Sequence, residues 1–347
     1  MPPGTNQSSK FATQVIKFGM AKISTKYLGL ELKSPVIAGS SGMTNSVEKI
    51  VALAKAGAGA VVLKSLFEEQ ILMKGTKIAS ESDAFTGYTE ALDYITQYSA
   101  EKDVSDYLSL IRDAKSAVDI PVIASINCVS SSEWVRFAGK IEEAGADALE
   151  VNLFILPSDP KLASTENEER YFEVARALLK SVKIPVALKL SHYFSGLANT
   201  LLKLSWTGIH GMVLFNRFFS PDIDIEKMEV IPSHVFSYPD EIALSLRWIA
   251  MLSDTVHCDL AASTGIHDGE AVVKQLLAGA KAVQVASALY KKGPEVITEM
   301  NQFVEKWLDK NGFGSLDEII GKLSLKSAEN PAAYERVQFM KHFAGIE

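Results

Sequence analysis

The tripeptide Ala-Gly-Ala at residues 144–146, followed by the apolar run Ala148-Leu149-Glu150-Val151, recurs along the chain. The same joint stands at residues 56–58 and 278–280, and Thr207-Gly208-Ile209 is a weaker copy of it. Glycine is favoured just past the end of a helix, and a short apolar run is typical of a buried strand. Each joint therefore indicates a helix that ends and a strand that begins.

A second joint alternates with the first and reads Ser34-Pro35-Val36, Ile120-Pro121-Val122 and Ile184-Pro185-Val186. Proline is tolerated at the first residue of a strand. Together the joints predict eight short strands that begin near residues 35, 60, 121, 148, 185, 211, 258 and 282, with helical patterns between them. This alternation predicts an α/β fold, a closed (β/α)8 TIM barrel with insertions at its C-terminal face.

Composition limits the possible partners and compartments. The chain has 347 residues, 47% of them hydrophobic, and a net charge of -7, which argues against nucleic acid or an anionic membrane as the main partner. No apolar stretch approaches the roughly 18 residues of a membrane span, and the two cysteines form no disulfide framework or zinc motif. We therefore expect a cytoplasmic protein without a metal site.

The domain organisation follows from the same pattern. Residues 1–19 are polar and are predicted to form a mobile N-terminal extension, and residues 20–347 to form a single barrel domain with a C-terminal helical tail. Two stretches, 65–103 and 217–238, are longer than barrel connections require. Long insertions at the strand-end face usually make lids or substrate walls, although a surface excursion without a role is the alternative for the second stretch.

Active sites of such barrels lie where the strands end, which directs attention to four polar residues. Lys64 and Lys189 end the second and fifth strands, where a lysine is well placed to hold an anion or a developing negative charge. Asn152 and Asn216 end the fourth and sixth strands and offer both a donor and an acceptor, although asparagine is also a common turn residue.

The seventh and eighth strands end in small and hydroxyl-bearing residues. Ser263-Thr264-Gly265 and Ala286-Ser287 are suited to a phosphate cradle made of backbone N–H groups, because glycine permits close approach and hydroxyls add donors. The alternative is that these residues only cap the helices that follow.

The motifs taken together resemble those of the soluble, cytosolic dihydroorotate dehydrogenases over about residues 22 to 322. The resemblance rests on six segments in order and spacing: Ala38-Gly39-Ser40, Lys64-Ser65, Glu150-Val151-Asn152-Leu153, Leu188 to Phe194, Ser263-Thr264-Gly265-Ile266 and Gln284 to Leu289. No single motif would suffice, but the set is specific.

The resemblance implies FMN bound across the strand ends. It places Ser40 and Lys64 near the isoalloxazine ring, and Ser125, Asn152 and Lys189 along the edge of that ring. It places the backbone of Thr264-Gly265 and Ala286-Ser287, next to Ser263, around the FMN phosphate. A lysine at the position of Lys189 would stabilise negative charge at the flavin N1–C2 end during reduction.

The substrate half departs from the family pattern. The family places a cysteine or serine base in an Asn-Leu-Ser-Cys-Pro-Asn loop, and here that loop reads Asn152-Leu153-Phe154-Ile155-Leu156-Pro157. Ile155 cannot accept a proton, and Pro157 replaces a substrate-side asparagine. The glycine-rich turn after the sixth strand appears only as residues 234–237, and the family's loop asparagine has no clear counterpart around residues 85–88.

A replacement base is not obvious. His192, which follows Lys189 and titrates near neutral pH, is the sharpest candidate, and a packing or surface role is the alternative. Cys128 and Tyr193 are weaker candidates.

The leading interpretation is an FMN-dependent oxidoreductase that oxidises dihydroorotate to orotate by hydride transfer to flavin N5, with Lys189, Lys64 and His192 as catalytic residues. Asn152 and Asn216 would contact a small planar substrate. Alternatives are an FMN enzyme for another pyrimidine or an activated alkene, a flavin-binding electron-transfer subunit, and a non-flavin aldolase or isomerase that uses Lys189. The electron acceptor stays open, and a homodimer is common for such barrels.

Overall fold

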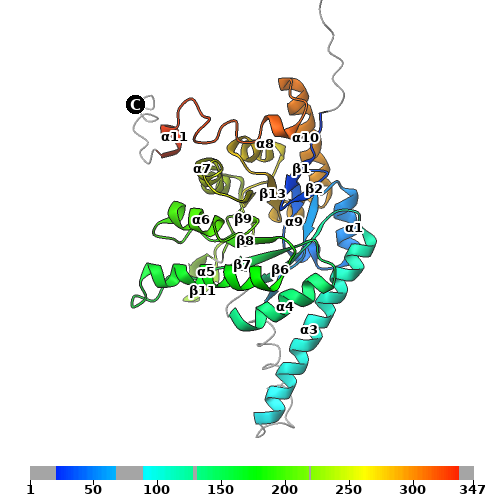
Figure 1. The fold of residues 1–347 in the computed structure, drawn as a ribbon, viewed down its shortest axis with the longest axis vertical. Helices are drawn as coiled ribbons and strands as arrows, with labels where there is room; N and C mark the ends of the chain where they lie inside the picture. Colours follow the sequence, from blue (N-terminus) through cyan, green and yellow to red (C-terminus); the bar gives the residue numbers. More distant parts are fainter. Residues whose placement is uncertain (1–20, 68–88, 128–130, 219, 336–347) are drawn as a thin grey trace, which may run out of the picture.

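The computed structural model describes residues 21–67, 89–127, 131–218 and 220–335. Within these residues, eight parallel strands close into a barrel with helices around its outside (Figure 1). The strands are β3 (Val36–Ala38), β4 (Ala60–Val62), β6 (Val122–Asn127), β7 (Ala148–Leu153), β8 (Val186–Leu190), β9 (Gly211–Leu214), β12 (Asp259–Ser263) and β13 (Ala282–Val285). Their order is β4-β3-β13-β12-β9-β8-β7-β6, and pairing of β4 with β6 closes the ring. The predicted TIM barrel is confirmed.

The helices alternate with these strands and cover the barrel. They are α1 (Val47–Lys55), α3 (Thr89–Ala117), α4 (Ser131–Glu143), α5 (Ser164–Ser181), α6 (Leu197–Ser205), α7 (Ile242–Leu252), α8 (Gly269–Ala278), α9 (Ser287–Lys292), α10 (Glu295–Asn311) and α11 (Ala332–Glu335). Short 3-10 helices lie at η1 (Gly42–Thr44), η2 (Pro239–Glu241) and η3 (Leu316–Glu318). Among the described helices, none is long and apolar enough to cross a membrane.

A hairpin of β1 (Thr25–Tyr27) and β2 (Leu30–Leu32) covers the N-terminal end of the barrel. Tyr27 and Leu28 are buried in one cluster with the small residues Ala60, Ala148 and Ala187 of the barrel interior. The backbone N–H of Leu28 donates to the carboxylate of Asp259 at 2.8 Å, at the first residue of β12. Because alanine leaves room inside the bore, the two large side chains of the hairpin fill it from below.

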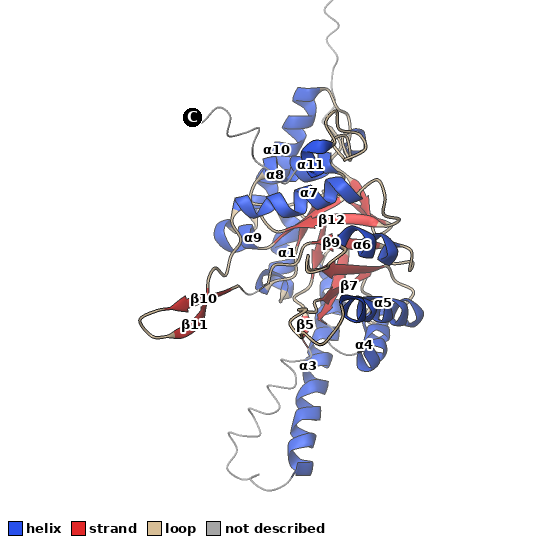
Figure 2. Cartoon of the chain, turned by 90° about the vertical axis from the view of Figure 1, so that its left-hand side faces the viewer, coloured by secondary structure: helices blue, strands red, loops and turns tan. Residues whose placement is uncertain are grey.

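Both predicted insertions contain regular structure. Residues 89–103, which the sequence analysis places in the first insertion, form the start of α3, a helix that extends away from the barrel (Figure 2). The segment from Thr89 to Ala117 contains no glycine or proline, which explains why it continues as one helix. The second insertion carries the antiparallel hairpin of β10 (Pro221–Asp224) and β11 (Glu229–Pro232), which projects from the body (Figure 2).

Candidate active site

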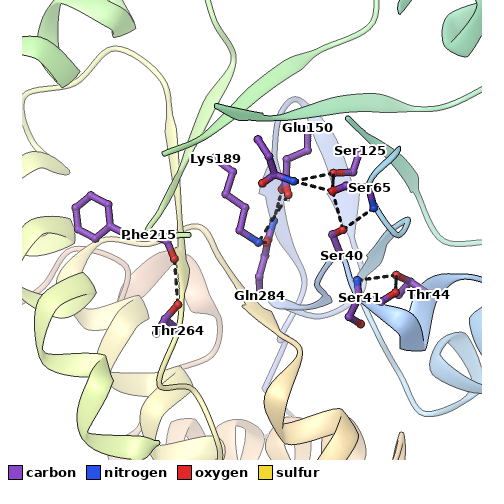
Figure 3. A network of polar contacts seen from close by, with 11 residues as sticks. Ser40, Ser41, Thr44, Ser65, Ser125, Glu150, Lys189, Phe215, Thr264 and Gln284 are labelled. Atoms are coloured by element: carbon purple, nitrogen blue, oxygen red, sulfur yellow. Dashed lines mark hydrogen bonds and ion pairs between the residues drawn. The ribbon is translucent and has the colours of Figure 1, made fainter. Parts of the chain in front are cut away.

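Four polar side chains form a hydrogen-bonded network at the C-terminal ends of the strands (Figure 3). Three of them are predicted site residues, and the fourth, Ser65, follows the predicted Lys64. The hydroxyls of Ser40 and Ser65 lie 3.0 Å apart, and those of Ser65 and Ser125 lie 2.7 Å apart. The amide nitrogen of Asn152 donates to the Ser65 hydroxyl at 2.7 Å and contacts the Ser125 hydroxyl at 3.3 Å. We call Ser40, Ser65, Ser125 and Asn152 the serine network.

The barrel brings the serine network together because its strands are parallel and adjacent. Ser40 and Ser65 follow β3 and β4, and Ser125 and Asn152 lie on β6 and β7, so all four approach the same rim. Asn152 is 6% exposed, and its side-chain oxygen has no hydrogen-bond partner within the described residues. A buried acceptor without a donor is available to the N–H of a ligand or to a water molecule.

Lys189 belongs to a second buried group, which we call the Glu150 triad. Its ammonium donates to the side-chain oxygen of Gln284 at 2.8 Å and lies 3.8 Å from a carboxylate oxygen of Glu150. The amide nitrogen of Gln284 donates to the other oxygen of Glu150. All three residues are at most 7% exposed, and Figure 3 shows them side by side next to the serine network.

Tyr107 of α3 supports the serine network from outside the barrel. Its hydroxyl donates to the carbonyl of Ser125 at 2.9 Å and accepts from the N–H of Ser125 at 2.7 Å. Pairing of β4 with β6 ends at Ile123 and resumes with Leu66 of the two-residue strand β5 (Leu66–Phe67) opposite Ile126, so this hydroxyl satisfies backbone groups in the gap. Burial raises the pKa of Tyr107 well above its ordinary value, and the phenol stays neutral.

The ends of β12 and β13 form the predicted anion cradle. Ser263 and Gln284 are paired in register, which sets Thr264-Gly265 beside residues 285–286. Thr264 and Gly265 both have positive φ, 77° and 78°, which turns the chain sharply at this point. Within the described residues, the backbone N–H groups of Thr264, Gly265, Ala286 and Ser287 donate to no protein acceptor. These unused donors at two neighbouring strand ends fit an anionic group.

The loop before α7 closes one side of this cradle. The N–H of Ser237 donates to the Ser287 hydroxyl at 3.0 Å, and the Ser237 hydroxyl lies 2.9 Å from Nε2 of His267. The ammonium of Lys291 donates to the Ser237 carbonyl at 2.8 Å. These contacts place Ser237, the last residue of the stretch 234–237, against the cradle.

His192 and Asn216 lie outside the serine network, in a cavity of about 340 Å³ between the ends of β8, β9 and β12 and helix α7, which adjoins the cradle at Ser263 and Thr264. Tyr193, Arg217, Glu241 and Thr264 also line it. Arg217 and Glu241 form an ion pair of 2.8 Å, which no sequence motif indicates. Burial lowers the pKa of His192, so the imidazole is neutral at pH 7.

The remaining predicted residues stand apart or lie outside the described residues. The Lys64 side chain is exposed and has no polar partner among the described residues, and its backbone N–H donates to the Thr44 carbonyl at 3.3 Å. Cys128 and the stretch 85–88 are outside the part of the chain that the structure describes. No group of three or more His, Cys, Asp or Glu residues in the described part could hold a metal ion.

The loop after β7 is apolar where a base is expected. Ile155 packs against the main core, and its N–H donates to the Tyr171 hydroxyl at 3.0 Å. Next to it, the rings of Phe154 and Phe218 stack with centroids 3.6 Å apart. The structure therefore shows no proton acceptor at position 155 and an aromatic pair beside it.

Comparison with known proteins decides the family. Residues 22–308 match the family model described as dihydroorotate dehydrogenase. The chain belongs to the dihydroorotate dehydrogenase family. The predicted membership is thus confirmed, and the match begins where the resemblance was expected to begin.

Two relatives illustrate the similarity of this dihydroorotate dehydrogenase-family chain. The catalytic subunit of dihydroorotate dehydrogenase B (NAD(+)) from Methanocaldococcus jannaschii is 26% identical over 311 residues, which are 87% of this chain and 98% of the relative. A putative dihydroorotate dehydrogenase A (fumarate) from Aeropyrum pernix is 33% identical over 210 residues, 58% of this chain and 67% of the relative. The similarity to the first relative thus covers nearly the whole of that protein.

Proposed function

We propose that this protein is an FMN-dependent oxidoreductase that acts on a CH–CH bond, with dihydroorotate as its reference substrate and orotate as the product. Family membership supports the reaction class, and homologues named as dihydroorotate dehydrogenases support the substrate. The observation that carries the proposal is the unpartnered, buried Asn152 oxygen beside the serine network and Lys189.

The residues present fit FMN. The Asn152 oxygen needs a donor, as the imide N–H of a flavin would supply, and Lys189 has N–H groups left for a ring carbonyl. The four unused N–H groups of Thr264, Gly265, Ala286 and Ser287 suit a phosphate. When bound, FMN supplies the two-electron acceptor for a hydride.

The chain's own residues then have separate tasks. Lys189 places a buried positive charge where negative charge develops, and it needs no reorganisation because Gln284 already holds it. Ser40, Ser65 and Ser125 orient Asn152 through their shared hydrogen bonds. His192, neutral and inside the cavity with Asn216, is the group that takes the substrate proton in this proposal.

A second candidate keeps FMN and changes the substrate to another pyrimidine or an activated alkene. Ile155 in place of the family's base and the stacked Phe154 and Phe218 favour it, because this part of the loop offers apolar surface instead of hydrogen bonds. A cytoplasmic location and a homodimer stay predictions from the sequence.

The test is reconstitution of the purified protein with FMN, followed by anaerobic mixing with dihydroorotate in a stopped-flow spectrometer. We expect a bound yellow flavin that dihydroorotate bleaches, and bleaching that slows about 10²-fold or more in His192→Ala. Protein that stays colourless after reconstitution contradicts FMN binding. If flavin binds but dihydroorotate does not bleach it, the second candidate function is favoured. If bleaching stays rapid in His192→Ala, His192 is not the proton acceptor.

A further inference from the structure

Glu150 is a buried charge that the proposed reaction does not use. It lies on β7 inside the bore, 1% exposed, two residues before Asn152 on the same strand. One of its carboxylate oxygens accepts from Gln284, and the other has no hydrogen-bond partner within the described residues. A carboxylate removed from water in this way requires compensation by a positive charge.

Gln284 reaches Glu150 from the opposite wall of the barrel. Three strands separate β7 from β13 in either direction around the ring. A carboxylate only accepts hydrogen bonds and an ammonium only donates them. The Gln284 amide therefore has one orientation, with its nitrogen toward Glu150 and its oxygen toward Lys189.

This arrangement holds the two charges near each other but not in direct contact. Lys189 is 2.8 Å from the Gln284 oxygen and 3.8 Å from Glu150, beyond ordinary hydrogen-bond length. Glu150 also acts electrostatically on Tyr27 of the β1–β2 hairpin, at the N-terminal end of the bore. Burial raises the pKa of Tyr27, and the charge of Glu150 raises that pKa further.

We infer that Glu150 is a positioning residue that acts through Gln284 and Lys189 and sets how much positive charge the flavin experiences. Gln284 keeps the ammonium away from the carboxylate and at the strand ends, and Glu150 offsets part of its charge. The inference rests on the proposed FMN binding. It predicts that two neutral substitutions in the triad move the flavin potential in opposite directions.

In Glu150→Gln, no carboxylate offsets the positive charge of the Lys189 ammonium, so the reduced, anionic flavin is favoured. We expect the ratio of affinities for reduced and oxidised FMN to rise about tenfold, which is about 30 mV for a two-electron couple. In Gln284→Met, the ammonium loses its acceptor and is drawn to Glu150, so the potential shifts to more negative values. Glu150→Asp keeps the charge and should restore most of the parent potential.

The experiment measures the midpoint potential of each reconstituted variant by anaerobic dithionite titration against a redox dye at pH 6, together with the Kd of FMN for the apoprotein. Lys189→Met and the double variant with Glu150→Gln complete a double-mutant cycle. We expect the effect of Glu150→Gln to fall to less than half in the Lys189→Met background. Glu169→Gln removes an exposed carboxylate and is the control.

Thermal unfolding of the apoproteins separates a structural role from the inferred one. Glu150→Gln and Lys189→Met each leave one buried charge unpaired, and the double variant removes both charges, so the double variant should recover stability. The inference is overturned if Glu150→Gln changes stability but leaves the flavin potential unchanged or lowers it. It is also overturned if Glu150→Gln shifts the potential equally in the parent and in Lys189→Met. If Glu150→Gln does not fold, an unchanged potential in Gln284→Met overturns it. Failure of the parent protein to bind FMN contradicts the proposed function instead.

Discussion

At the scale of single residues, Lys189 is the residue on which the proposed chemistry depends most. The residue is 7% exposed, its ammonium is held by Gln284, and it is paired in register with Asn152, whose side-chain oxygen is unpartnered within the described residues. A cation fixed in this way stabilises a negative charge that develops beside it, because no solvent has to rearrange.

We expect Lys189→Met to slow flavin reduction by about 10²-fold or more, and to weaken FMN binding much less, since the charge matters most in the reduced state. Single-turnover reduction and FMN titration measure the two effects. Lys183→Met, at an exposed lysine before the opposite end of β8, is the matched control. Equal reduction rates in Lys189→Met and the parent would remove the assigned role.

The sequence indicates which polar residues lie at the strand ends, but it does not indicate which side chains they contact. Strand-end motifs point to Asn152 and Lys189, the family resemblance adds Ser40 and Ser125, and the structure brings these residues to one rim. Glu150 and Gln284 appear in the same motifs without a role, because their contact spans the barrel and depends on closure of the ring. Lys64 shows the converse, since its position after a strand does not determine where its side chain points.

At the scale of elements, packing of helix α3 against strand β6 supports the serine network. Helix α3 presents Tyr107 to a break in the β4 and β6 pairing, and one hydroxyl satisfies both backbone groups of Ser125. The sequence predicts the strands from their apolar runs, but a break of this kind has no local signal. Its repair by a helix residue depends on tertiary packing.

We predict that Tyr107→Phe destabilises the protein by about 1–3 kcal/mol, because it leaves the buried N–H and C=O of Ser125 without partners. The FMN Kd should rise with it, since Ser125 supports Asn152. Urea unfolding and FMN titration measure the two effects. Ser116→Ala removes an exposed hydroxyl of the same helix, away from the site, and should leave both quantities close to those of the parent. A Tyr107→Phe variant as stable as the parent would show that the hydroxyl is dispensable.

At the scale of the whole molecule, stability should depend on pH through two histidines, the half-buried His192 and the buried His267. Burial lowers the pKa of His192, and burial with the nearby Lys291 and Lys292 lowers that of His267. The unfolded chain therefore takes up protons first as the pH falls below about 6.5. The free energy of unfolding should decrease from there until the pH passes the lowered pKa values.

Unfolding at pH 7.5 and pH 5.5 tests this expectation. The double variant His192→Gln/His267→Gln should lose less stability between the two pH values than the parent does. His257→Gln, at an exposed histidine, is the control. The same loss in the parent and the double variant would show that other groups set the acid sensitivity.

The hairpin of β1 and β2 has a consequence for ions in solution. Tyr27 and Leu28 fill the N-terminal end of the bore with at most 2% exposure, so counterions cannot approach Glu150 from that side. Dissolved salt screens exposed charges over about 30 Å at 0.01 M and about 3 Å at 1 M. The shift in potential caused by Glu150→Gln should therefore keep its size across this range of ionic strength. A surface charge acting on the flavin from outside the barrel would lose its effect as salt is added.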